Sequence, residues 1–448
     1  MRLVFLLLFC FSFIVNSLAQ VWSPLGGGIN GSGGVFTLLA NDSIGKLYAG
    51  GMFYKAENRP AMRLAEWNGA SWLPVGSGMD NTVKSLAWID GKLYAGGEFA
   101  RAGGVPANCI ARWDGITWEA LGKGMVKTGQ HSFPAAVNAI AEYQGQVYAA
   151  GVFDLADGNP VGYISRWDGT KWINVGAGFT NVAEALIVYK DELYAAGRFA
   201  QAGGKTANKI ARWNGAEWNS VGQATGLQGG SAANCFTIMN GKLYVGGSFT
   251  MADGKPVNRI AVWDGATWSA LGDGISLDGV FGLTNDGTNI YATGYFLTAG
   301  SKTVNHLARW DGAEWHSMGT GLGNGYGLAA TILDGELVVG GTFTEVDGIQ
   351  AGNVAIWGTT SGIERYSSSL FTVAPNPFRD GFSIYLEGSS GGSAYWITDI
   401  SGRVVRQEEL EYVLSAIFIS RESLPAGIYF LQLRDGDGNT STQKLIAE

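Results

Sequence analysis

The chain has 448 residues, of which 46% are hydrophobic and only 15% are charged, so it contains enough apolar material for a large globular core. A formal net charge of −8 excludes a nucleic acid or an anionic membrane surface as the main partner, because both attract clustered lysine and arginine side chains. The 69 glycines, 16 tryptophans, 17 tyrosines and 21 phenylalanines favour many short strands joined by tight turns, with aromatic rings between the sheets.

The first 19 residues have the pattern of a secretory signal peptide. Arg2 precedes an apolar run over residues 3–15, and the small residues that follow suit cleavage after Ala19. No later stretch approaches the roughly 18 to 20 apolar residues of a membrane-spanning helix. We therefore expect a soluble mature protein without a transmembrane segment.

Seven segments of the chain repeat one pattern. The first reads Leu47-Tyr-Ala-Gly-Gly-Met-Phe53, and its counterparts end at phenylalanines that lie 46 to 54 residues apart. A tryptophan follows each phenylalanine after 14 residues, and in all but the last repeat Asn-Gly or Asp-Gly comes next. The tryptophans are Trp67, Trp113, Trp167, Trp213, Trp263, Trp310 and Trp357. One supersecondary unit copied seven times at this period predicts a β-propeller.

Each repeat reads as four strands joined by short turns. In the second repeat, Asp90-Gly91 predicts a type I′ turn between the first and second strands. Asp114-Gly115 predicts the same kind of turn between the third and fourth strands. A two-residue turn there would place the small Ala111 opposite Trp118, and the other repeats would share this pairing.

The seventh repeat lacks its fourth strand, because no second tryptophan follows Trp357. The missing strand lies at the start of the mature chain, where Trp22-Ser-Pro-Leu-Gly26 matches Trp72-Leu-Pro-Val-Gly76 of the first repeat. We therefore expect residues 21–26 to pair with the strand that ends at Trp357, with Trp22 opposite Ala355. This pairing would close the ring and remove its exposed edges.

The repeats resemble known propeller families over residues 21–358. The segments Leu-Tyr-Ala-Gly-Gly-x-Phe and Ile-Ala-Arg-Trp-Asp-Gly-x-x-Trp are similar to kelch-like repeats, and closer still to repeats of secreted bacterial proteins and fungal Rax2-like surface proteins. The expected fold is all-β: a seven-bladed β-propeller with four-stranded blades, closed by the N-terminal strand and followed by a small immunoglobulin-like β-sandwich. Cys109 and Cys235 fall in the second and fifth blades, too far apart for a disulfide, so two unpaired thiols are expected.

A different pattern begins after a linker at residues 359–369. Residues 370–448 contain blocks that start at Ala374, Ile397, Leu424 and Gln443, and their alternation indicates the strands of a small sandwich. The motif residues in these blocks are Pro375, Asn376, Pro377, Phe378, Asp399, Gly402, Arg403, Gly427, Tyr429 and Lys444.

The four blocks resemble the Por-type (type A) sorting domain of proteins exported by the type IX secretion system of Gram-negative bacteria. The resemblance implies the type IX machinery as a partner, passage through the outer membrane, and either release or attachment at the cell surface. The alternative is an ordinary immunoglobulin-like accessory domain. The expected organisation is a signal peptide at 1–19, a propeller at 20–358, a linker at 359–369 and a sorting domain at 370–448.

A ligand site is expected on one face of the ring. The short Asp-Gly and Asn-Gly turns share one face, whereas the connections of variable length, such as residues 123–134 and 223–233, share the other. The candidate residues on the variable face are Lys127, Gln130, His131, Phe133, Asp80, Asn81, Asn181, Asp278, Asn324 and Tyr326. Polar groups mixed with exposed rings suit a sugar or a peptide, and the alternative is that they are solvated loop residues.

The chain offers few residues that could form a catalytic or metal site. The chain has three histidines, and they do not form a metal site by their spacing, so no metal and no cofactor are expected. We expect a secreted or cell-surface protein whose propeller binds a glycan or protein ligand, and we lean against an enzyme. Two alternatives stay open: an extracellular polysaccharide or peptide hydrolase or lyase with its site in the propeller channel, and a structural adhesion element.

Overall fold

The structure is a computed structural model that describes residues 20–31, 33–57, 59–128, 134–223, 225–359, 371–374, 376–386, 393–400, 402–410, 416–421, 424–434 and 440–447. The predicted signal peptide lies outside these residues. Every regular element in the described ranges is a β-strand. None of the described residues form a helix long and apolar enough to span a membrane.

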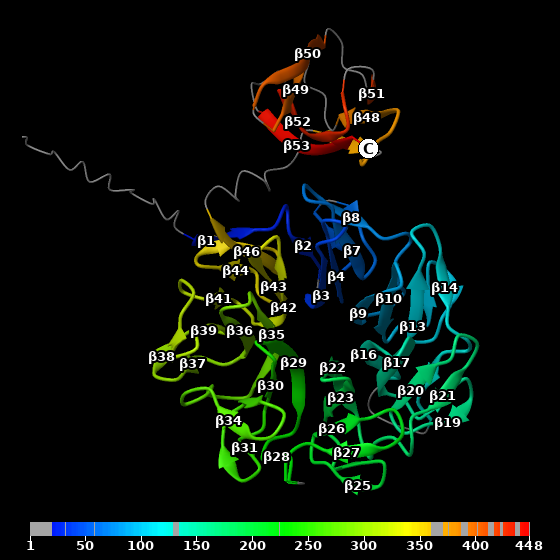
Figure 1. Cartoon of the computed structure of the whole chain (residues 1–448), viewed down its shortest axis with the longest axis vertical. Coiled ribbons are helices and arrows are strands. Elements are labelled where there is room, and N and C mark those ends of the chain that lie inside the picture. The colour runs from blue at the N-terminus through cyan, green and yellow to red at the C-terminus, as the bar shows by residue number, and fades with distance from the viewer. Residues whose placement is uncertain are drawn as a thin grey trace, which may run out of the picture.

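Residues 20–359 form a ring of sheets around a central axis (Figure 1). In this part of the chain the described residues make seven four-stranded antiparallel sheets, which we number sheets 1 to 7. From the innermost strand outward they are β3 (Val35–Asn41), β4 (Lys46–Gly51), β7 (Leu64–Trp67) and β8 (Trp72–Pro74); β9 (Val83–Ile89), β10 (Lys92–Gly97), β13 (Ile110–Trp113) and β14 (Trp118–Ala120); β16 (Ala136–Tyr143), β17 (Gln146–Val152), β20 (Ile164–Trp167) and β21 (Trp172–Asn174); β22 (Ala183–Tyr189), β23 (Glu192–Gly197), β26 (Ile210–Trp213) and β27 (Trp218–Ser220); β29 (Ala233–Met239), β30 (Lys242–Gly247), β33 (Ile260–Trp263) and β34 (Trp268–Ala270); β35 (Gly279–Asn285), β36 (Ile290–Tyr295), β39 (Leu307–Trp310) and β40 (Trp315–His316); and β42 (Gly327–Leu333), β43 (Glu336–Gly341), β46 (Val354–Thr359) and β1 (Gln20–Pro24).

A small hairpin follows the second strand of each sheet. The chain segment that enters the sheet pairs with this hairpin, either as a short strand or through a single bridge, so each hairpin ties two consecutive sheets together. The short strands are β2 (Ile29–Asn30), β5 (Lys55–Ala56) and β6 (Arg59–Pro60); β11 (Arg101–Ala102) and β12 (Val105–Pro106); β15 (Met125–Val126), β18 (Leu155–Ala156) and β19 (Asn159–Pro160); β24 (Gln201–Ala202) and β25 (Lys205–Thr206); β28 (Leu227–Gln228), β31 (Met251–Ala252) and β32 (Lys255–Pro256); β37 (Thr298–Ala299) and β38 (Lys302–Thr303); and β41 (Leu322–Gly323), β44 (Glu345–Val346) and β45 (Ile349–Gln350).

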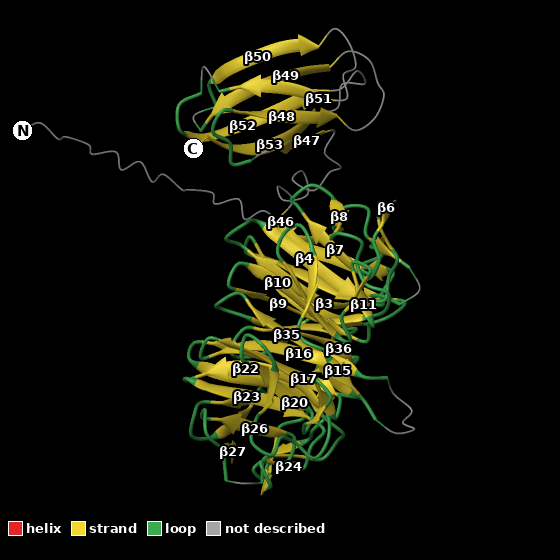
Figure 2. Ribbon diagram, turned by 90° about the vertical axis from the view of Figure 1, so that its right-hand side faces the viewer, coloured by secondary structure: helices red, strands yellow, loops and turns green. Residues whose placement is uncertain are grey.

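The C-terminal residues form two further antiparallel sheets (Figure 2). One contains β47 (Phe371–Ala374), β48 (Gly381–Leu386) and β51 (Ala416–Ser420), and the other contains β50 (Val404–Leu410), β49 (Ser393–Asp399), β52 (Gly427–Arg434) and β53 (Thr440–Ala447). The two sheets share one buried core, in which Phe382, Tyr395 and Leu431 are fully buried.

The inner hairpins form as the sequence predicts. Ile89 pairs with Lys92, and the two residues between them have positive φ angles of 48° at Asp90 and 72° at Gly91. These angles are those of a type I′ turn, which matches the twist of the two strands.

The outer hairpins differ from the prediction by two residues. Trp113 pairs with Trp118, not with Ile116, so the expected pairing of Ala111 with Trp118 is wrong. The loop has four residues because Oδ1 of Asp114 accepts the backbone N–H groups of Ile116 at 2.8 Å and Thr117 at 2.7 Å. The Asp-Gly pair therefore makes a side-chain-capped turn, and the two tryptophan rings pack on each other across the strands.

The N-terminal strand joins the last sheet. β1 pairs with β46 along its whole length, which confirms that the two ends of the ring meet in one sheet. The register again differs by two residues, because Trp22 pairs with Trp357 and Pro24 pairs with Ala355.

Consecutive sheets pack a tryptophan face against a face that carries a tyrosine in every described propeller sheet but sheet 7, where Val338 takes its place. In the cluster between sheets 1 and 2, Leu93 and Trp118 of sheet 2 pack against Tyr48 and Leu64 of sheet 1, and all four side chains are buried. Because side chains alternate between the two faces of a strand, the same repeat supplies both surfaces. The two cysteines are unpaired, as expected, and burial raises the pKa of the Cys109 thiol to about 12.

A hydrogen bond from six of the seven outer tryptophans ties each of their sheets to the sheet before it. The indole N–H of Trp72 donates to the carbonyl of Leu25, which follows the outer strand of the preceding sheet. The other bonds of this kind run from Trp118 to Val75, Trp172 to Leu121, Trp218 to Val175, Trp315 to Leu271 and Trp22 to Met318, with N–O distances between 2.9 and 3.4 Å.

Trp268 is the exception among the outer tryptophans. Its indole nitrogen is buried and has no hydrogen-bond partner among the described residues. The junction between sheets 4 and 5 therefore lacks this bond.

This difference allows a test of the tryptophan hydrogen bond. Trp22→Phe should lower the free energy of unfolding by about 1–3 kcal/mol, because it leaves the carbonyl of Met318 without its donor. Trp268→Phe makes the same change in side-chain size but removes an indole N–H that has no hydrogen-bond partner, so it should lower the free energy of unfolding by less. Denaturant unfolding of both variants measures the difference, and an equal loss would show that the bond contributes nothing.

The side-chain-capped turns should depend on pH. Hydrogen bonds from the backbone of Thr267 and Ala266 lower the pKa of Asp264 to about 2. Because this folded-state pKa lies below the unfolded value of about 3.9, the stabilisation is complete above about pH 5 and is lost as the pH falls toward 2. Unfolding of the wild type and of Asp264→Asn, measured from pH 5 to pH 2, should show the advantage of the wild type shrinking. An advantage that is constant over this range would contradict the assignment.

Candidate binding site at the mouth of the central channel

The inner strand of each sheet has a bulge near its first residue. In sheet 2, Val83 pairs with Gly97 and Ser85 with Gly96, so Lys84 is left without a partner. A bulge of this kind redirects the extra side chain. The equivalent residues of the seven described sheets, which we call the mouth ring, are Phe36, Lys84, Asn138, Glu184, Asn234, Phe281 and Leu328, and each is partly exposed.

The bulge explains the glycine at or next to the end of the second strand of each described propeller sheet. A Cβ atom on Gly97 would lie 2.0 Å from the carbonyl oxygen of Thr82, which the bulge brings against the strand. That carbonyl accepts the N–H of Glu98 at 2.9 Å. Only glycine allows this approach, so the repeated glycine keeps the mouth ring in place.

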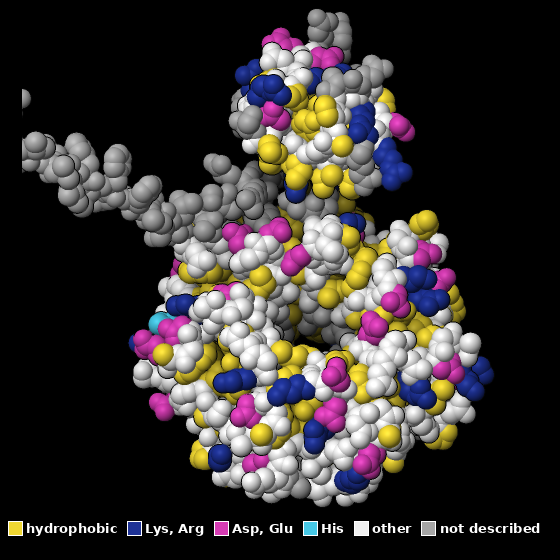
Figure 3. All heavy atoms as spheres, viewed as in Figure 1, with side chains coloured by type: hydrophobic (Ala, Val, Ile, Leu, Met, Phe, Trp, Pro, Cys, Tyr) yellow, Lys and Arg dark blue, Asp and Glu magenta, His cyan; other side chains and the backbone are white. Residues whose placement is uncertain are grey.

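The polar residues of the mouth ring line part of a cavity in the centre of the molecule, which Figure 3 shows as a hollow. The cavity has a volume of about 210 Å³, and Lys84, Asn138, Glu184 and Asn234 are among its lining residues. The connections of variable length reach the inner strands beside these bulges. The mouth ring therefore lies on the face for which the sequence predicts a ligand site.

Sheets 2 to 5 contribute the polar half of the mouth ring. Lys84 forms an ion pair with Glu98 at 2.7 Å, and Glu184 forms one with Arg198 at 2.7 Å. The second carboxylate oxygen of Glu184 accepts a hydrogen bond from Nδ2 of Asn138 at 2.8 Å. Each acid is therefore balanced by a base, and this half offers fixed donors and acceptors with little net charge.

Sheets 6, 7 and 1 contribute the apolar half, in which Phe281 belongs to a partly exposed aromatic cluster. The ring of Tyr326 lies 5.8 Å from Phe281 and 5.6 Å from Tyr295 between centroids, and Tyr295 also stacks on His306. Tyr295 is 44% exposed, although every other sheet has a non-aromatic residue at this position. Burial lowers the pKa of His306 and favours its neutral form. The cluster is an aromatic surface beside the channel.

Several residues that the sequence singles out make contacts within their own loops. Oδ1 of Asp80 accepts the N–H groups of Ala100 and Arg101, both at 2.9 Å, and Oδ1 of Asn81 accepts that of Thr82 at 2.8 Å. These carboxylate and amide oxygens are therefore partly used in holding the hairpin of sheet 2.

The remaining candidates are spread over several connections. Lys127 pairs with Asp154 at 2.9 Å and lies over the ring of Tyr163, while Gln130, His131 and Phe133 fall outside the described residues. Oδ1 of Asn181 accepts the N–H of Val182, Asp278 is exposed, Nδ2 of Asn324 lies 3.5 Å from Glu345, and Tyr326 belongs to the aromatic cluster. The described candidates thus share a face but do not meet at one point, and their role in binding stays a prediction.

Sequence reasoning missed the mouth ring and Tyr295. Each ring residue stands one or two positions after the first residue of its inner strand, and an alignment of the seven repeats on the bulge shows a position that is charged or amide-bearing in four repeats and apolar in three. No group of three or more potential metal ligands gathers among the described side chains.

The first C-terminal motif is fixed to the last strand of the chain. Nδ2 of Asn376 donates to the carbonyl of Lys444 at 2.7 Å, and Oδ1 accepts the N–H of Ile446 at 2.9 Å. Pro377 is exposed, Phe378 is buried and bridges to Ala447, and Pro375 lies outside the described residues.

The other two motifs shape turns of the same domain. Asp399 accepts from the backbone N–H of Arg403 at 3.1 Å and from its side chain at 3.0 Å, around a turn in which Gly402 has a φ of 82°. Gly427 begins β52, and the hydroxyl of Tyr429 donates to the carbonyl of Pro425 at 2.8 Å. The motif residues that are described therefore hold the sandwich together.

Two families match parts of the chain. Residues 372–448 match a family described as a secretion system C-terminal sorting domain. Residues 90–113, 240–261 and 333–355 match a β-propeller domain of unknown function. Each of these three segments runs from the inner hairpin turn to the third strand of a sheet. No curated protein matches the chain.

Three solved structures are similar in fold over most of the chain. Two are the extracellular domain of a B. thetaiotaomicron protein described once as a one component system and once as a hybrid two component system, with 14% identity in both cases and TM-scores of 0.48 and 0.49. The third is the extracellular domain of a second B. thetaiotaomicron hybrid two component system, with 10% identity and a TM-score of 0.48. They cover 96–97% of this chain, whereas the chain spans only 57–59% of theirs.

These findings give the class of the protein. The chain is all-β in its described residues and contains a β-propeller followed by a sorting domain of the type IX secretion system. The sorting domain implies interaction with that secretion machinery and export to the cell surface or the extracellular space.

Export should depend on the C-terminal domain. Deletion of residues 370–448 should leave the protein in the periplasm, because the secretion machinery then has no sorting domain to act on. Cell fractionation with an antibody against the propeller measures this, and the full-length chain expressed at the same level is the control. A truncated chain that reaches the cell surface or the medium as efficiently as the control would contradict the prediction.

Proposed function

We propose that the protein is a secreted or surface-attached binding protein that captures an extracellular glycan at the mouth of its propeller. In this proposal the seven sheets are the seven blades of a kelch-like, Rax2-like propeller over residues 20–358, which the N-terminal strand closes. Residues 1–19 are a signal peptide, 359–369 a linker, and 370–448 an immunoglobulin-like sorting sandwich. The described candidates on the variable face, and Gln130, His131 and Phe133 outside the described residues, would extend the contact area.

The observation that carries the proposal is the division of the mouth ring. Its polar half presents Asn138, Asn234 and two ion pairs, and its apolar half borders the aromatic cluster around Tyr326. A sugar ring has the same division, because its hydroxyl groups project from the edge and its C–H groups form an apolar face. A few placed polar groups next to aromatic surface are typical of small-molecule sites.

A protein ligand fits this site less well than a glycan. The largest exposed side chains of the apolar half are confined to one cluster, whereas a stable protein interface needs a patch of roughly 800 Å² on each partner. The enzyme alternative has less support, because the acids at the mouth, Glu98 and Glu184, are each held by a base. Neither is placed as an unpaired acid facing a second one.

Binding to a glycan array tests this proposal. The mature full-length chain should bind a subset of oligosaccharides, and Tyr295→Ala and Glu184→Gln should each weaken the binding at least tenfold. The matched controls are Ile116→Ala, which removes an exposed apolar side chain from the opposite face, and Glu217→Gln, which breaks the exposed ion pair with Lys205 on the rim. Both controls should bind as the wild type does.

The stability of the variants separates binding from folding. Arg198 is exposed although Glu184 is only partly so, and glutamine keeps the size of the side chain and one acceptor oxygen, so Glu184→Gln should melt close to the wild type. If the array shows no bound oligosaccharide, or if both mouth variants bind as well as their controls, the proposed glycan site is wrong.

A further inference from the structure

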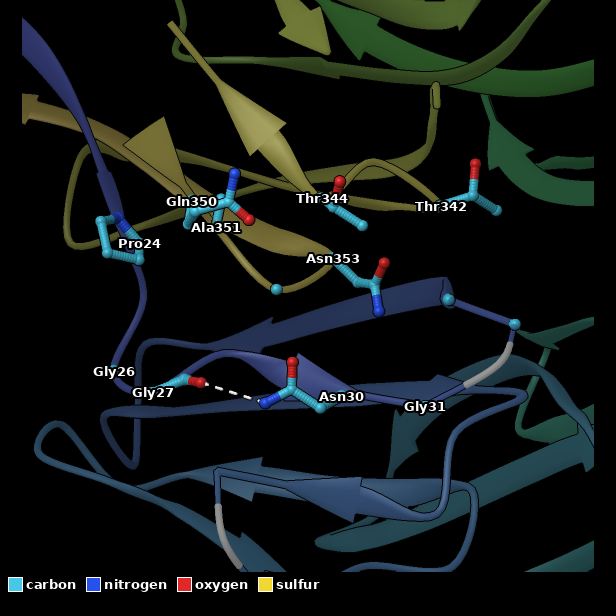
Figure 4. Close-up of a pocket in the computed structure, with 13 residues that line it drawn as sticks. Pro24, Gly26, Gly27, Asn30, Gly31, Thr342, Thr344, Gln350, Ala351 and Asn353 are labelled. Carbon is cyan, nitrogen blue, oxygen red and sulfur yellow. Dashed lines mark hydrogen bonds between the residues drawn. The ribbon is translucent and has the colours of Figure 1, made fainter. Parts of the chain in front are cut away.

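A second cavity lies between sheets 7 and 1, beside the mouth ring. It has a volume of about 510 Å³, within the range of about 300–1,000 Å³ that small-molecule sites occupy. Figure 4 shows Thr342, Thr344 and Gln350 on one wall and Asn30 on the other. The described lining residues are Pro24, Gly26, Gly27, Asn30, Gly31, Gly33, Gly34, Thr342, Thr344, Gln350, Ala351, Gly352 and Asn353. We call this cavity the glycine cleft.

The lining of the glycine cleft has no charge. Its described side chains carry amides and hydroxyls, without an acid, a lysine, an arginine or a histidine. The side chains of Thr344 and Gln350 are exposed and have no hydrogen-bond partner among the described residues. Nδ2 of Asn30 makes only a long bond of 3.4 Å to the carbonyl of Gly27. The cleft therefore offers unused neutral donors and acceptors on both walls.

The backbone at the floor of the cleft cannot accept a peptide strand. β2 is the edge strand of its small sheet, but the N–H of Ile29 already donates to the carbonyl of Gly352 at 2.7 Å. The carbonyl of Ile29 accepts Nδ2 of Asn353 at 2.7 Å. Strand addition needs these groups free, so a peptide would have no ladder to join.

Two tyrosines lie near the cleft without being among its lining residues. Tyr54 is 46% exposed and lies against Gly31, where a Cβ atom would be 3.3 Å from its ring. The backbone N–H of Thr342 donates to the carbonyl of Tyr326, whose ring belongs to the aromatic cluster. A neutral polar cleft with tyrosines nearby has the chemistry that recognises hydroxyl groups and the apolar faces of sugar rings.

We propose that the glycine cleft between sheets 7 and 1 binds a short oligosaccharide without charged groups. The inference rests on the proposed function only in that the propeller meets an extracellular glycan. It adds a separate site and restricts the ligand to neutral sugars. A charged sugar would leave its carboxylate or sulfate without a basic partner in the cleft, and desolvating an unpaired charge is unfavourable for binding.

The test uses the mature full-length chain and an array of two kinds of probe. One kind is neutral di- to hexasaccharides of glucose, galactose, mannose and xylose, and the other is uronic acid and sulfated oligosaccharides of the same lengths. Neutral probes should bind, and the double variant Thr344→Ala/Gln350→Ala should weaken their binding at least tenfold. Thr250→Ala is the matched control, because Thr250 has the position of Thr344 in sheet 5, and it should bind as the wild type does.

The outcomes separate this site from the mouth ring. Loss of neutral-sugar binding in the double variant, with an unchanged melting temperature, supports the glycine cleft even if Tyr295→Ala and Glu184→Gln have no effect. Binding that is lost only in those two mouth variants overturns the cleft and leaves the proposed function standing. Binding restricted to charged probes, or no binding to any probe, also overturns the inference.

Discussion

The ring depends on one interaction repeated between neighbouring sheets. An outer tryptophan buries its ring between two sheets and donates its indole N–H to a carbonyl at the end of the preceding outer strand, as Trp72 does to Leu25. Burial of the indole ring stabilises the contact without fixing its geometry. The N–H fixes the geometry, because a buried carbonyl that loses its hydrogen-bond donor lowers the stability of the fold. Together they fix the distance and the rotation between sheets.

The bond from Trp22 differs from the others, because it joins the first described strand to a carbonyl 296 residues later. The other bonds of this kind connect residues 43 to 51 positions apart and can form as each repeat folds onto the one before it. The closure of the ring must therefore wait for the whole propeller. A late, non-local contact of this kind is the slow step that loop-closure entropy predicts.

Much of this fold can be predicted from the repeat, and the errors in the predicted strand register have one cause. The period gives the strands, the number of repeats and the pairing of the first strand with the last one. The register of the outer hairpins cannot be read from an Asp-Gly pair alone, because the same dipeptide forms a two-residue turn at Asp90 and a four-residue, side-chain-capped loop at Asp114. Whether the aspartate backbone turns to positive φ or its carboxylate caps the next amides depends on the strands on either side.

The candidate site was less predictable than the fold. The face could be predicted from loop length, but the loops hold residues such as Asp80 for their own hairpins. The mouth ring depends on a bulge, which moves a residue such as Glu184 from the sheet surface to the channel, and a strict two-residue alternation does not reveal it. The glycine cleft could not be predicted either, because its walls come from residues more than 300 positions apart in the sequence.

Native-state hydrogen exchange read by mass spectrometry tests the central claim that the first strand is an integral part of the last sheet. If β1 closes the ring, the amides of peptides covering residues 20–25 should exchange as slowly as those of β46, because both would open only when the whole propeller unfolds. Fast exchange of residues 20–25, with β46 and β43 still protected, would show that the ring is stable without its N-terminal strand and would contradict this account.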